Sequence, residues 1–267
     1  MSFERIIVGV DDSDLGFEAL RQALILRTSG GSVRAVTVVE DYLAAQAGFD
    51  ATRVAAELAE AAERTGQRVQ ALIADEPGAD SSLRRGNAAA ALLAACRGEQ
   101  ATLLVAGARH HSRAVGELLG ATSTAALHDA PCPVLLARPG SGAPWRPGRI
   151  VVGVDGSAQS LAALAVATAL AERFGSSVTA AAATGGKPIE REQAWAGRID
   201  VWAESAPVPA LHDLSADADL LIIGSRGLHG LRALGSVSER LAHRAACSVL
   251  VVRPTAYGAE PVPADVA

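Results

Sequence analysis

The sequence predicts an α/β protein built from two tandem doubly wound units, each a parallel sheet with helices on both faces, of which the second is abbreviated. Two observations lead to this fold class. Apolar runs rich in β-branched residues alternate with amphipathic helical stretches along the 267 residues, which is typical of parallel strands joined by crossover helices. Segments at the start and end of the first half also recur in the second half, so one unit occurs twice.

The repeat is clearest at the two ends of each unit. Ile6–Ser13 reads Ile-Ile-Val-Gly-Val-Asp-Asp-Ser, and Ile150–Ser157 reads Ile-Val-Val-Gly-Val-Asp-Gly-Ser. Cys132–Pro139 and Cys247–Pro254 share the pattern Cys-x-Val-Leu-x-x-Arg-Pro, and they stand closer together than the two opening segments, so the second unit is shorter. The expected organisation is a first half at residues 1–139, a linker rich in glycine and proline at 140–148, a second half at 149–255 and a flexible tail at 256–267.

The first half alternates strand and helix throughout. Ile6–Val10 is a continuous apolar run, as expected of a strand covered on both faces. Ser13 can cap the next helix, whose apolar residues from Phe17 to Leu24 share one face, and Gly30-Gly31 ends it. The later elements are expected as strands at Val33–Val39, Val69–Ile73, Thr102–Ala106 and Val134–Ala137, and as helices at Val54–Arg64, Ala88–Cys96 and Thr122–Leu127.

The second half repeats this order with a loss in its middle. Ser157 can cap its first helix, and the stretch between Thr184 and Gly224 is too short for a full copy of the first half. We expect only a short strand near Ile199–Trp202 and a short helix near Ala210–Ser215 in that stretch. The other strands of this half are expected at Val178–Ala183, Leu220–Ile223 and Val249–Val252.

Composition and charge exclude several classes of partner. The net charge is -5 with no basic block, which argues against a nucleic-acid or anionic-membrane partner. The apolar stretches are too short for a membrane span, and Asp11 and Asp12 interrupt the beginning of the chain, so no signal peptide is expected. Three cysteines without metal-ligand spacing suit a reduced, cytoplasmic location with small buried thiols and no metal centre.

The aspartates that close the first strand of each half are the first candidate site residues. In open α/β sheets, ligands bind at the carboxyl ends of strands near the topological switch point. Asp11 or Asp155 could accept hydrogen bonds there from a ribose or a base edge. Each could equally cap the following helix together with Ser13 or Ser157, and the two roles are compatible.

A glycine-rich loop after the fourth strand is the second candidate. The second half reads Gly224-Ser225-Arg226-Gly227, then seven residues, then Gly235-Ser236-Val237-Ser238 opening a helix. Glycines let backbone amides approach a phosphate, and a helix N-terminus adds N–H groups and a favourable dipole. A tight structural turn with a serine cap would give the same pattern.

In these segments the chain resembles the universal stress protein family, in its tandem form, over both halves. The resemblance implies a five-stranded parallel sheet of order 3-2-1-4-5 in each half. It also implies pairing through strand five, which would join the halves as an intramolecular pseudo-dimer and allows a homodimer. Many members bind ATP through the strand-one aspartate and a loop of the form Gly, two residues, Gly, nine residues, Gly-Ser/Thr, whereas others lack the motif.

Neither half carries the family loop intact. The first half keeps its length, but His110 replaces a glycine and Ala121 replaces the hydroxyl residue. The second half keeps the residues in a shorter loop, and Thr184 stands where Val39 would line the adenine in the first half. The resemblance marks as nucleotide contacts Asp11, Val39, Gly107, Arg109, Gly120, Ala121, Thr122 and Ser123 in the first half, and Asp155, Gly224, Arg226, Gly227, Gly235, Ser236, Val237 and Ser238 in the second.

The expected function is binding of ATP, with Mg²⁺ as its companion ion, in at least one half, coupled to stress response or signalling through protein partners. Catalysis is not expected beyond very slow ATP hydrolysis, because Gly186-Lys187-Pro188 contains the only lysine and the proline defeats a phosphate-binding loop of the Walker type. The alternative is an interaction scaffold with degenerate sites that works without a nucleotide.

Overall fold

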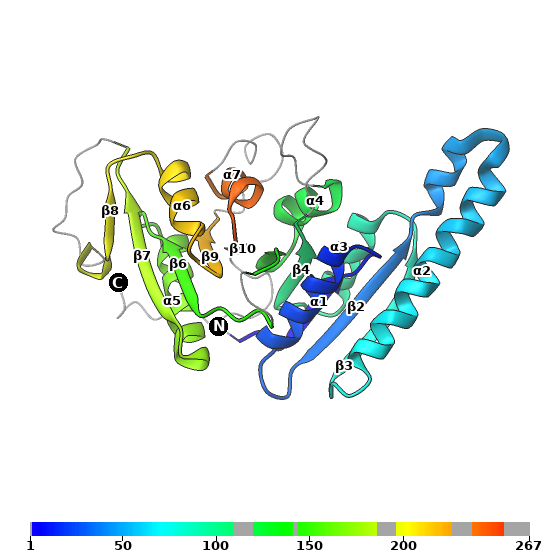
Figure 1. Ribbon diagram of the computed structural model, residues 1–267, viewed down its shortest axis with the longest axis horizontal. Coiled ribbons are helices and arrows are strands. Elements are labelled where there is room, and N and C mark those ends of the chain that lie inside the picture. Colours follow the sequence, from blue (N-terminus) through cyan, green and yellow to red (C-terminus); the bar gives the residue numbers. More distant parts are fainter. Residues whose placement is uncertain (1, 109–119, 141–143, 186–195, 226–236, 254–267) are drawn as a thin grey trace.

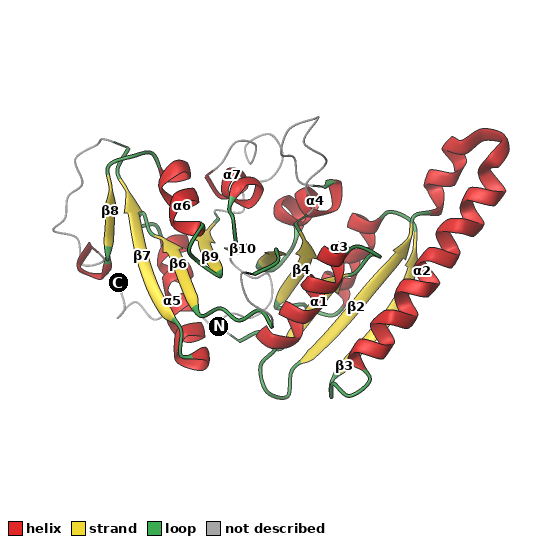
Figure 2. Ribbon diagram, in the orientation of Figure 1, coloured by secondary structure: helices red, strands yellow, loops and turns green. Residues whose placement is uncertain are grey.

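The computed structural model describes residues 2–108, 120–140, 144–185, 196–225 and 237–253. These residues form one continuous ten-stranded sheet in the order β3-β2-β1-β4-β5-β10-β9-β6-β7-β8, with helices on both faces (Figures 1 and 2). The first half contributes β1 (Arg5–Gly9), α1 (Asp14–Leu26), β2 (Ser32–Val39), the 3₁₀ turns η1 (Asp41–Asp50), α2 (Ala51–Ile73), β3 (Ala79–Arg85), α3 (Ala88–Gly98), β4 (Leu103–Gly107), α4 (Ala121–Asp129) and β5 (Val134–Ala137).

The second half has the same order with a shortened middle. It contributes β6 (Arg149–Gly153), α5 (Ala158–Phe174), β7 (Ser177–Ala183), the 3₁₀ turn η2 (Ala196–Arg198), β8 (Val201–Ala203), α6 (Pro207–Ser215), β9 (Leu220–Gly224), α7 (Val237–Arg244) and β10 (Ser248–Val252). The expected short strand and short helix are therefore confirmed as β8 and α6. Among the described residues, this half has no helix corresponding to α2.

Both halves have the strand order that the family resemblance implies. The first half runs β3-β2-β1-β4-β5 and the second runs β8-β7-β6-β9-β10, with parallel pairing inside each half. The halves meet through the antiparallel pair of β5 and β10, in which Leu136 lies opposite Val249 and Val134 lies opposite Val251. The expected pairing through strand five is thus present within one chain.

The prediction of a third strand at Val69–Ile73 is wrong. These residues form the last turns of α2, which runs well beyond the expected end at Arg64, and the third strand is Ala79–Arg85 instead. Thr65, Val69 and Ile73 are buried at helical spacing, so the apolar residues of the run belong to one face of a helix. The true strand was missed because Ala79–Arg85 is polar and lies at the edge of the sheet, where no apolar run is needed.

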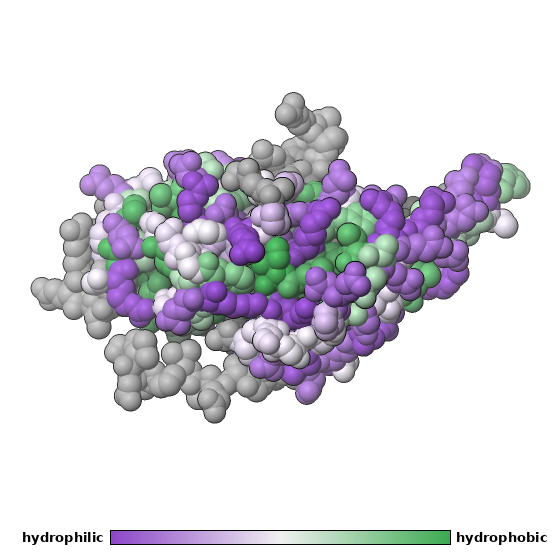
Figure 3. Space-filling model, turned by 60° about the horizontal axis from the view of Figure 1, so that its bottom comes forward, coloured by the Kyte–Doolittle hydropathy of each residue, from purple (hydrophilic) through white to green (hydrophobic). Residues whose placement is uncertain are grey.

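The first part of α2 and η1 form an arm that projects from the end of the sheet. Its buried helix residues begin only at Ala62, so the turns before it pack against little besides η1. Phe49, near the end of η1, is fully exposed. In Figure 3 the arm carries mainly hydrophilic residues along its length and a hydrophobic patch at its tip. The arm distinguishes the first half from the described part of the second.

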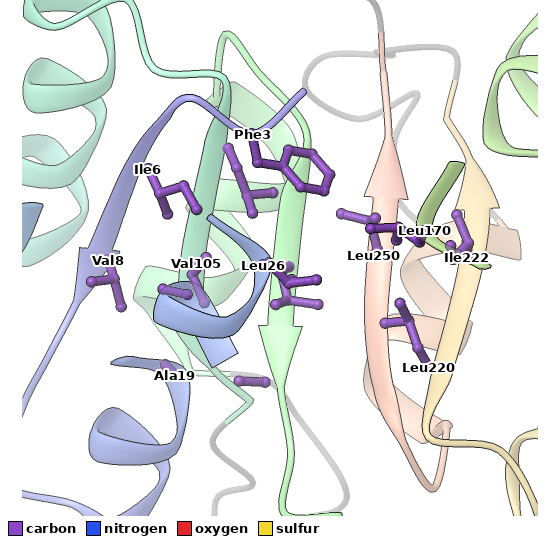
Figure 4. Packing of buried hydrophobic residues seen from close by; sticks show 14 of the residues in the cluster. Phe3, Ile6, Val8, Ala19, Leu26, Val105, Leu170, Leu220, Ile222 and Leu250 are labelled. Atoms are coloured by element: carbon purple, nitrogen blue, oxygen red, sulfur yellow. The ribbon is translucent and has the colours of Figure 1, made fainter. Parts of the chain in front are cut away.

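The core lies in two layers, one on each face of the sheet. The layer beneath α1, α2 and α5 contains Leu20, Val69 and Ala163, and the layer beneath α3, α4, α6 and α7 contains Leu92 and Leu241. Each layer runs across the junction of the halves. Figure 4 shows Phe3, Leu26 and Val105 in the first half and Leu170, Ile222 and Leu250 in the second, on opposite sides of the junction between β5 and β10, and all are members of one cluster. The two halves therefore share their core.

Trp145, in the described part of the segment expected as a linker, packs against the second half. Trp145 is buried within the core layer of α1 and α5, and its indole Nε1 donates a hydrogen bond to the carbonyl of Asp219 at 3.3 Å. A buried tryptophan with a satisfied N–H holds a chain segment in place. The described part of this connection is consequently anchored to the second half through Trp145.

Candidate functional site

The strand order places a topological switch point at the carboxyl ends of β1 and β4. β1 pairs with β2 on one side and with β4 on the other, and the helices that follow these strands cover opposite faces. Asp11 follows β1 and Gly107 ends β4, so two predicted site residues meet at this edge. β6 and β9 bring Asp155 and Gly224 together in the same way.

Asp11 and Asp155 both take part in capping the helix that follows them. Asp11 Oδ1 accepts hydrogen bonds from the backbone N–H of Ser13 at 3.0 Å and from its hydroxyl. Asp155 Oδ1 accepts from the N–H of Ser157 at 3.0 Å and from its hydroxyl at 2.6 Å. The two serine hydroxyls in turn accept N–H groups of α1 and α5. Both aspartates are exposed at the strand ends, so capping does not remove them from the surface.

Gly107 and Gly224 allow close packing between a strand end and a helix start. A Cβ on Gly107 would lie 3.0 Å from the backbone of Leu15, and one on Gly224 would lie 2.5 Å from the carbonyl carbon of Gln159. The distance at Gly224 is too short for a side chain, and at Gly107 Leu15 would have to shift to make room for one. The fold itself thus favours glycine at both positions, and these two positions alone do not indicate a phosphate site.

The start of α4 lies beside the end of β4. Gly120 precedes the helix in an extended conformation, and no side-chain capping hydrogen bond is present at the helix N-terminus among the residues that the structure describes. Ser123 is buried, and its hydroxyl donates to the carbonyl of Gly107 at 3.0 Å, which ties the helix to the strand. Ala121 is exposed and Thr122 is half-buried. The first N–H groups of any helix have no acceptor within the helix, so this end of α4 offers backbone donors.

The corresponding helix of the second half differs in charge. α7 begins at Val237, and Glu239 lies in its first turn, whereas α4 has no acidic residue there. Ser238 is half-buried at this start. The predicted site residues Arg109, Arg226, Gly227, Gly235 and Ser236 lie outside the described residues. The first turn of α7 therefore carries a carboxylate, which lies 3.4 Å from His128 Nε2, and the first turn of α4 carries none.

Val39 and Thr184 hold equivalent positions at the ends of β2 and β7. Val39 is buried, and its carbonyl accepts the N–H of Gly86 at 3.0 Å. The N–H of Thr184 donates to the carbonyl of Ala203 at 2.9 Å. Next to Val39, the carboxylate of Glu40 accepts the N–H of Ala88 at the start of α3 at 3.1 Å. Val39 is thus a buried residue beside the switch point of the first half, and hydrogen bonds hold the backbone around it.

Two buried arginines each form hydrogen bonds to the other half. In the sequence they stood out only as part of the repeated ending. Arg138, which follows β5, is 5% exposed and donates to the carbonyls of Ala242, His243 and Cys247. Arg253, which follows β10, is 4% exposed and donates to the carbonyls of Leu127 and Ala130. Burial lowers the pKa of Arg138 to about 10 and also lowers that of Arg253. The repeated Arg-Pro ending was the one sequence signal for this exchange.

Buried polar groups and thiols complete the junction. The Gln22 amide donates to the Arg138 carbonyl at 2.8 Å, and the Ser248 hydroxyl donates to Gln22 Oε1 at 2.9 Å. His128 Nε2 of α4 lies 3.4 Å from Glu239 Oε1 of α7, and the two helices lie side by side in Figure 1. The three cysteines, Cys96, Cys132 and Cys247, are buried, as predicted.

The described residues hold no group of three or more histidine, cysteine or acidic side chains arranged for a metal ion. No helix among them has the length and apolar character that a membrane span requires.

Comparison with known proteins identifies the relatives of this chain. The family model described as universal stress protein family matches residues 2–138 and 198–253. Universal stress protein Rv2623 of Mycobacterium tuberculosis is 30% identical over 185 residues, covering 58% of this chain and 62% of the relative, so the match spans less than two thirds of that protein. A universal stress protein of Thermus aquaticus is 35% identical over 142 residues, covering 51% of this chain and 99% of the relative.

A solved structure shares the whole fold. The crystal structure of a universal stress protein from Archaeoglobus fulgidus matches with a TM-score of 0.75 over 96% of this chain and 98% of the other, at 21% identity. At this identity the likeness supports the two-unit α/β architecture.

Proposed function

Because the chain belongs to the universal stress protein family, we propose that it is a non-catalytic stress-response protein that binds an adenine nucleotide, ATP, in at least one half. The observation that carries the proposal is the meeting of Asp11, the end of β4 and the N-terminus of α4 at one switch point. The carboxylate suits a ribose or base edge, and the helix N-terminus suits a phosphate.

The residues of the first half fit a nucleotide better than those of the second. The first turn of α4 carries no carboxylate, whereas Glu239 lies in the first turn of α7. A carboxylate at that place opposes a phosphate by like-charge repulsion. The first-half loop also keeps the family length. We therefore assign the stronger site to the first half, with Asp11 at the nucleoside and the Gly120–Ser123 amides at the phosphates.

Magnesium would accompany the nucleotide and neutralise its phosphates, which Mg²⁺ binds while keeping several waters. This chain's own residues would bind and orient the nucleotide. We propose no catalytic role for them, and the protein would act through the shape or surface that the bound state presents to protein partners.

Calorimetric titration of the full chain with ATP, ADP and AMP tests the proposal. Asp11→Asn is the informative variant, because an asparagine oxygen can still accept from Ser13 and preserve the helix cap. Loss of the carboxylate charge should weaken ATP binding about tenfold or more, since hydrogen bonds to charged groups are the strong ones. The matched Asp155→Asn change should have the smaller effect. A folded wild-type protein that gives no heat with any of the three nucleotides would overturn nucleotide binding.

The second candidate function is an interaction scaffold that needs no nucleotide. The projecting arm with its fully exposed Phe49 favours it, because a large apolar side chain at the tip of a polar arm suits contact with another protein. Failure of the titration in well-folded protein would leave this function as the better one.

A further inference from the structure

The reciprocal arginines connect each half to the helix that opens the other half's candidate phosphate site. α4 begins at the Gly120–Ser123 amides and ends near Leu127 and Ala130, whose carbonyls accept from Arg253 of the second half. α7 begins at Val237 and ends near Ala242 and His243, whose carbonyls accept from Arg138 of the first half. Each half therefore supplies the arginine that binds the C-terminal end of the other half's helix.

An arginine at this place can hold a whole helix. The last carbonyls of a helix have no donor within the helix and carry its negative dipole end, so a guanidinium satisfies both needs. α4 has nine residues, and at 1.5 Å per residue it spans roughly 13 Å. A helix this short behaves as a rigid body, so a constraint on its C-terminal end also constrains the position of its N-terminal end. Burial of Arg253 and its hydrogen bonds to Leu127 and Ala130 thus fix where the Gly120–Ser123 amides lie.

The start of each glycine-rich loop is tied to the same strand ends. The N–H of Ala108, directly after β4, donates to the carbonyl of Ala137 at 2.9 Å. Ala137 is the last residue of β5, and Arg138 follows it. The N–H of Ser225, directly after β9, donates to Val252 at 2.8 Å, directly before Arg253. The end of β5 therefore binds the loop start of the first half, and the arginine that follows it binds the helix of the second half. The end of β10 and its arginine do the same with the halves exchanged.

We propose that each half's nucleotide site is completed in trans, with Arg253 as the positioning residue for α4 of the first site and Arg138 as that for α7 of the second. This inference rests on the proposed function and names a dependence of each site on the other half. Neither arginine contacts the nucleotide. Each sets the geometry of backbone donors from the far end of a helix.

Hydrogen exchange of the full chain without nucleotide tests the positioning step. Arg253→Met should raise amide exchange in α4 about tenfold or more and raise it less in α7, whereas Arg138→Met should do the reverse. Arg253→Lys keeps the charge with fewer donors, so it should fall between wild type and Arg253→Met. It also keeps the test usable if the methionine variant does not fold. Arg97→Met, an exposed change on α3, is the matched control. Equal exchange in both helices, or a larger effect in the helix of the arginine's own half, would overturn the inference.

ATP titration of the same variants tests the consequence for binding. Arg253→Lys should weaken ATP binding about tenfold if α4 carries the stronger site, although it lies at the far end of that helix. Unchanged affinity alongside increased α4 exchange would overturn the role in the site. If the wild-type protein binds no nucleotide, the proposed function fails, while the crossed exchange pattern still decides whether the arginines position the helices.

Discussion

At the residue scale, Gly224 shows that a glycine in a ligand-binding pattern can be required by packing, because its position has no room for a Cβ atom. A Cβ there would lie 2.5 Å from the carbonyl carbon of Gln159, at the start of α5. The glycine is needed so that β9 and the first turn of α5 can approach closely, and Gly107 serves the same purpose against Leu15. The exposed aspartates beside these glycines carry more information about a ligand, because their capping role leaves them at the surface.

Alanine at Gly224 should destabilise the protein by roughly 1–3 kcal/mol, because the strand end and helix must move apart. Gly66→Ala is the matched change, since a Cβ at this place inside α2 would meet no atom within 4 Å. It should stabilise the protein by up to about 1 kcal/mol through helix propensity. Urea unfolding of the two variants measures both effects. Equal and small changes would show that the close approach at Gly224 is absent.

The buried thiols should make stability fall at alkaline pH. Burial raises the pKa of Cys247 to about 11, and a hydrogen bond with Cys132, together with burial, raises that of Cys96. A thiol that stays neutral in the folded state but ionises near pH 9 when unfolded favours folding fully below that pH. The contribution is lost as the pH rises from 9 through about 11, at about 1.4 kcal/mol per pKa unit.

Urea unfolding at pH 8 and pH 10.5 measures this loss, with Cys247→Ala as the comparison. The variant should lose less stability between the two pH values than the wild type. In native protein at pH 8, none of the three thiols should react with a thiol reagent until the chain unfolds, because all three are buried. An equal loss in variant and wild type would contradict the assignment to Cys247.

At the element scale, α2 marks the limit of what sequence patterns predict. The strands β1, β4, β5, β9 and β10 are apolar runs buried on both faces, and their positions followed from hydrophobicity alone. Val69–Ile73 is too short a run to separate helix from strand by its period. Only packing against the sheet shows that Thr65, Val69 and Ile73 share one helix face.

Alanine substitutions at adjacent positions in α2 test this correction. Ile73 is 7% exposed and Leu72 is 46% exposed, so the two neighbours have opposite environments. Ile73→Ala should cost about 2–5 kcal/mol of unfolding free energy, and Leu72→Ala should cost much less. Thermal unfolding of both variants gives the comparison. If Leu72→Ala were the more harmful change, the buried face of α2 would be assigned wrongly.

Part of the candidate site could also be predicted from the sequence, and the contacts between the halves could not. Asp11, Gly107 and Ser123 were found by repeat position and family pattern, and the structure brings them to one strand edge. The trans contacts of Arg138 and Arg253 could not be foreseen, because they depend on how β5 and β10 pair. Local patterns carry capping and strand signals, whereas a contact across the junction exists only once both halves are folded.

At the scale of the whole molecule, the junction makes two repeats into one body. β5 and β10 pair edge to edge, so neither strand is left as an exposed edge. Arg173 of α5 adds a further crossing, donating to the carbonyl of Leu26 at the end of α1 at 2.7 Å. Its counterpart in the first half by the repeat offset is Ser29, which has no guanidinium, so the described residues hold no reciprocal copy of this contact.

A shared core predicts one cooperative unfolding transition for the described halves. Leu135 of β5 lies opposite Leu250 of β10, and both side chains are fully buried. Leu135→Ala should therefore lower the stability of both halves together, by about 2–5 kcal/mol. Calorimetry should show a single peak in wild type and variant, with calorimetric and van't Hoff enthalpies in agreement. Leu83→Ala, an exposed change on the edge strand β3, is the control that should barely move the peak. Two separate peaks, with only one shifted by Leu135→Ala, would mean that the halves unfold independently and that the crossed arginines do not join them into one unit.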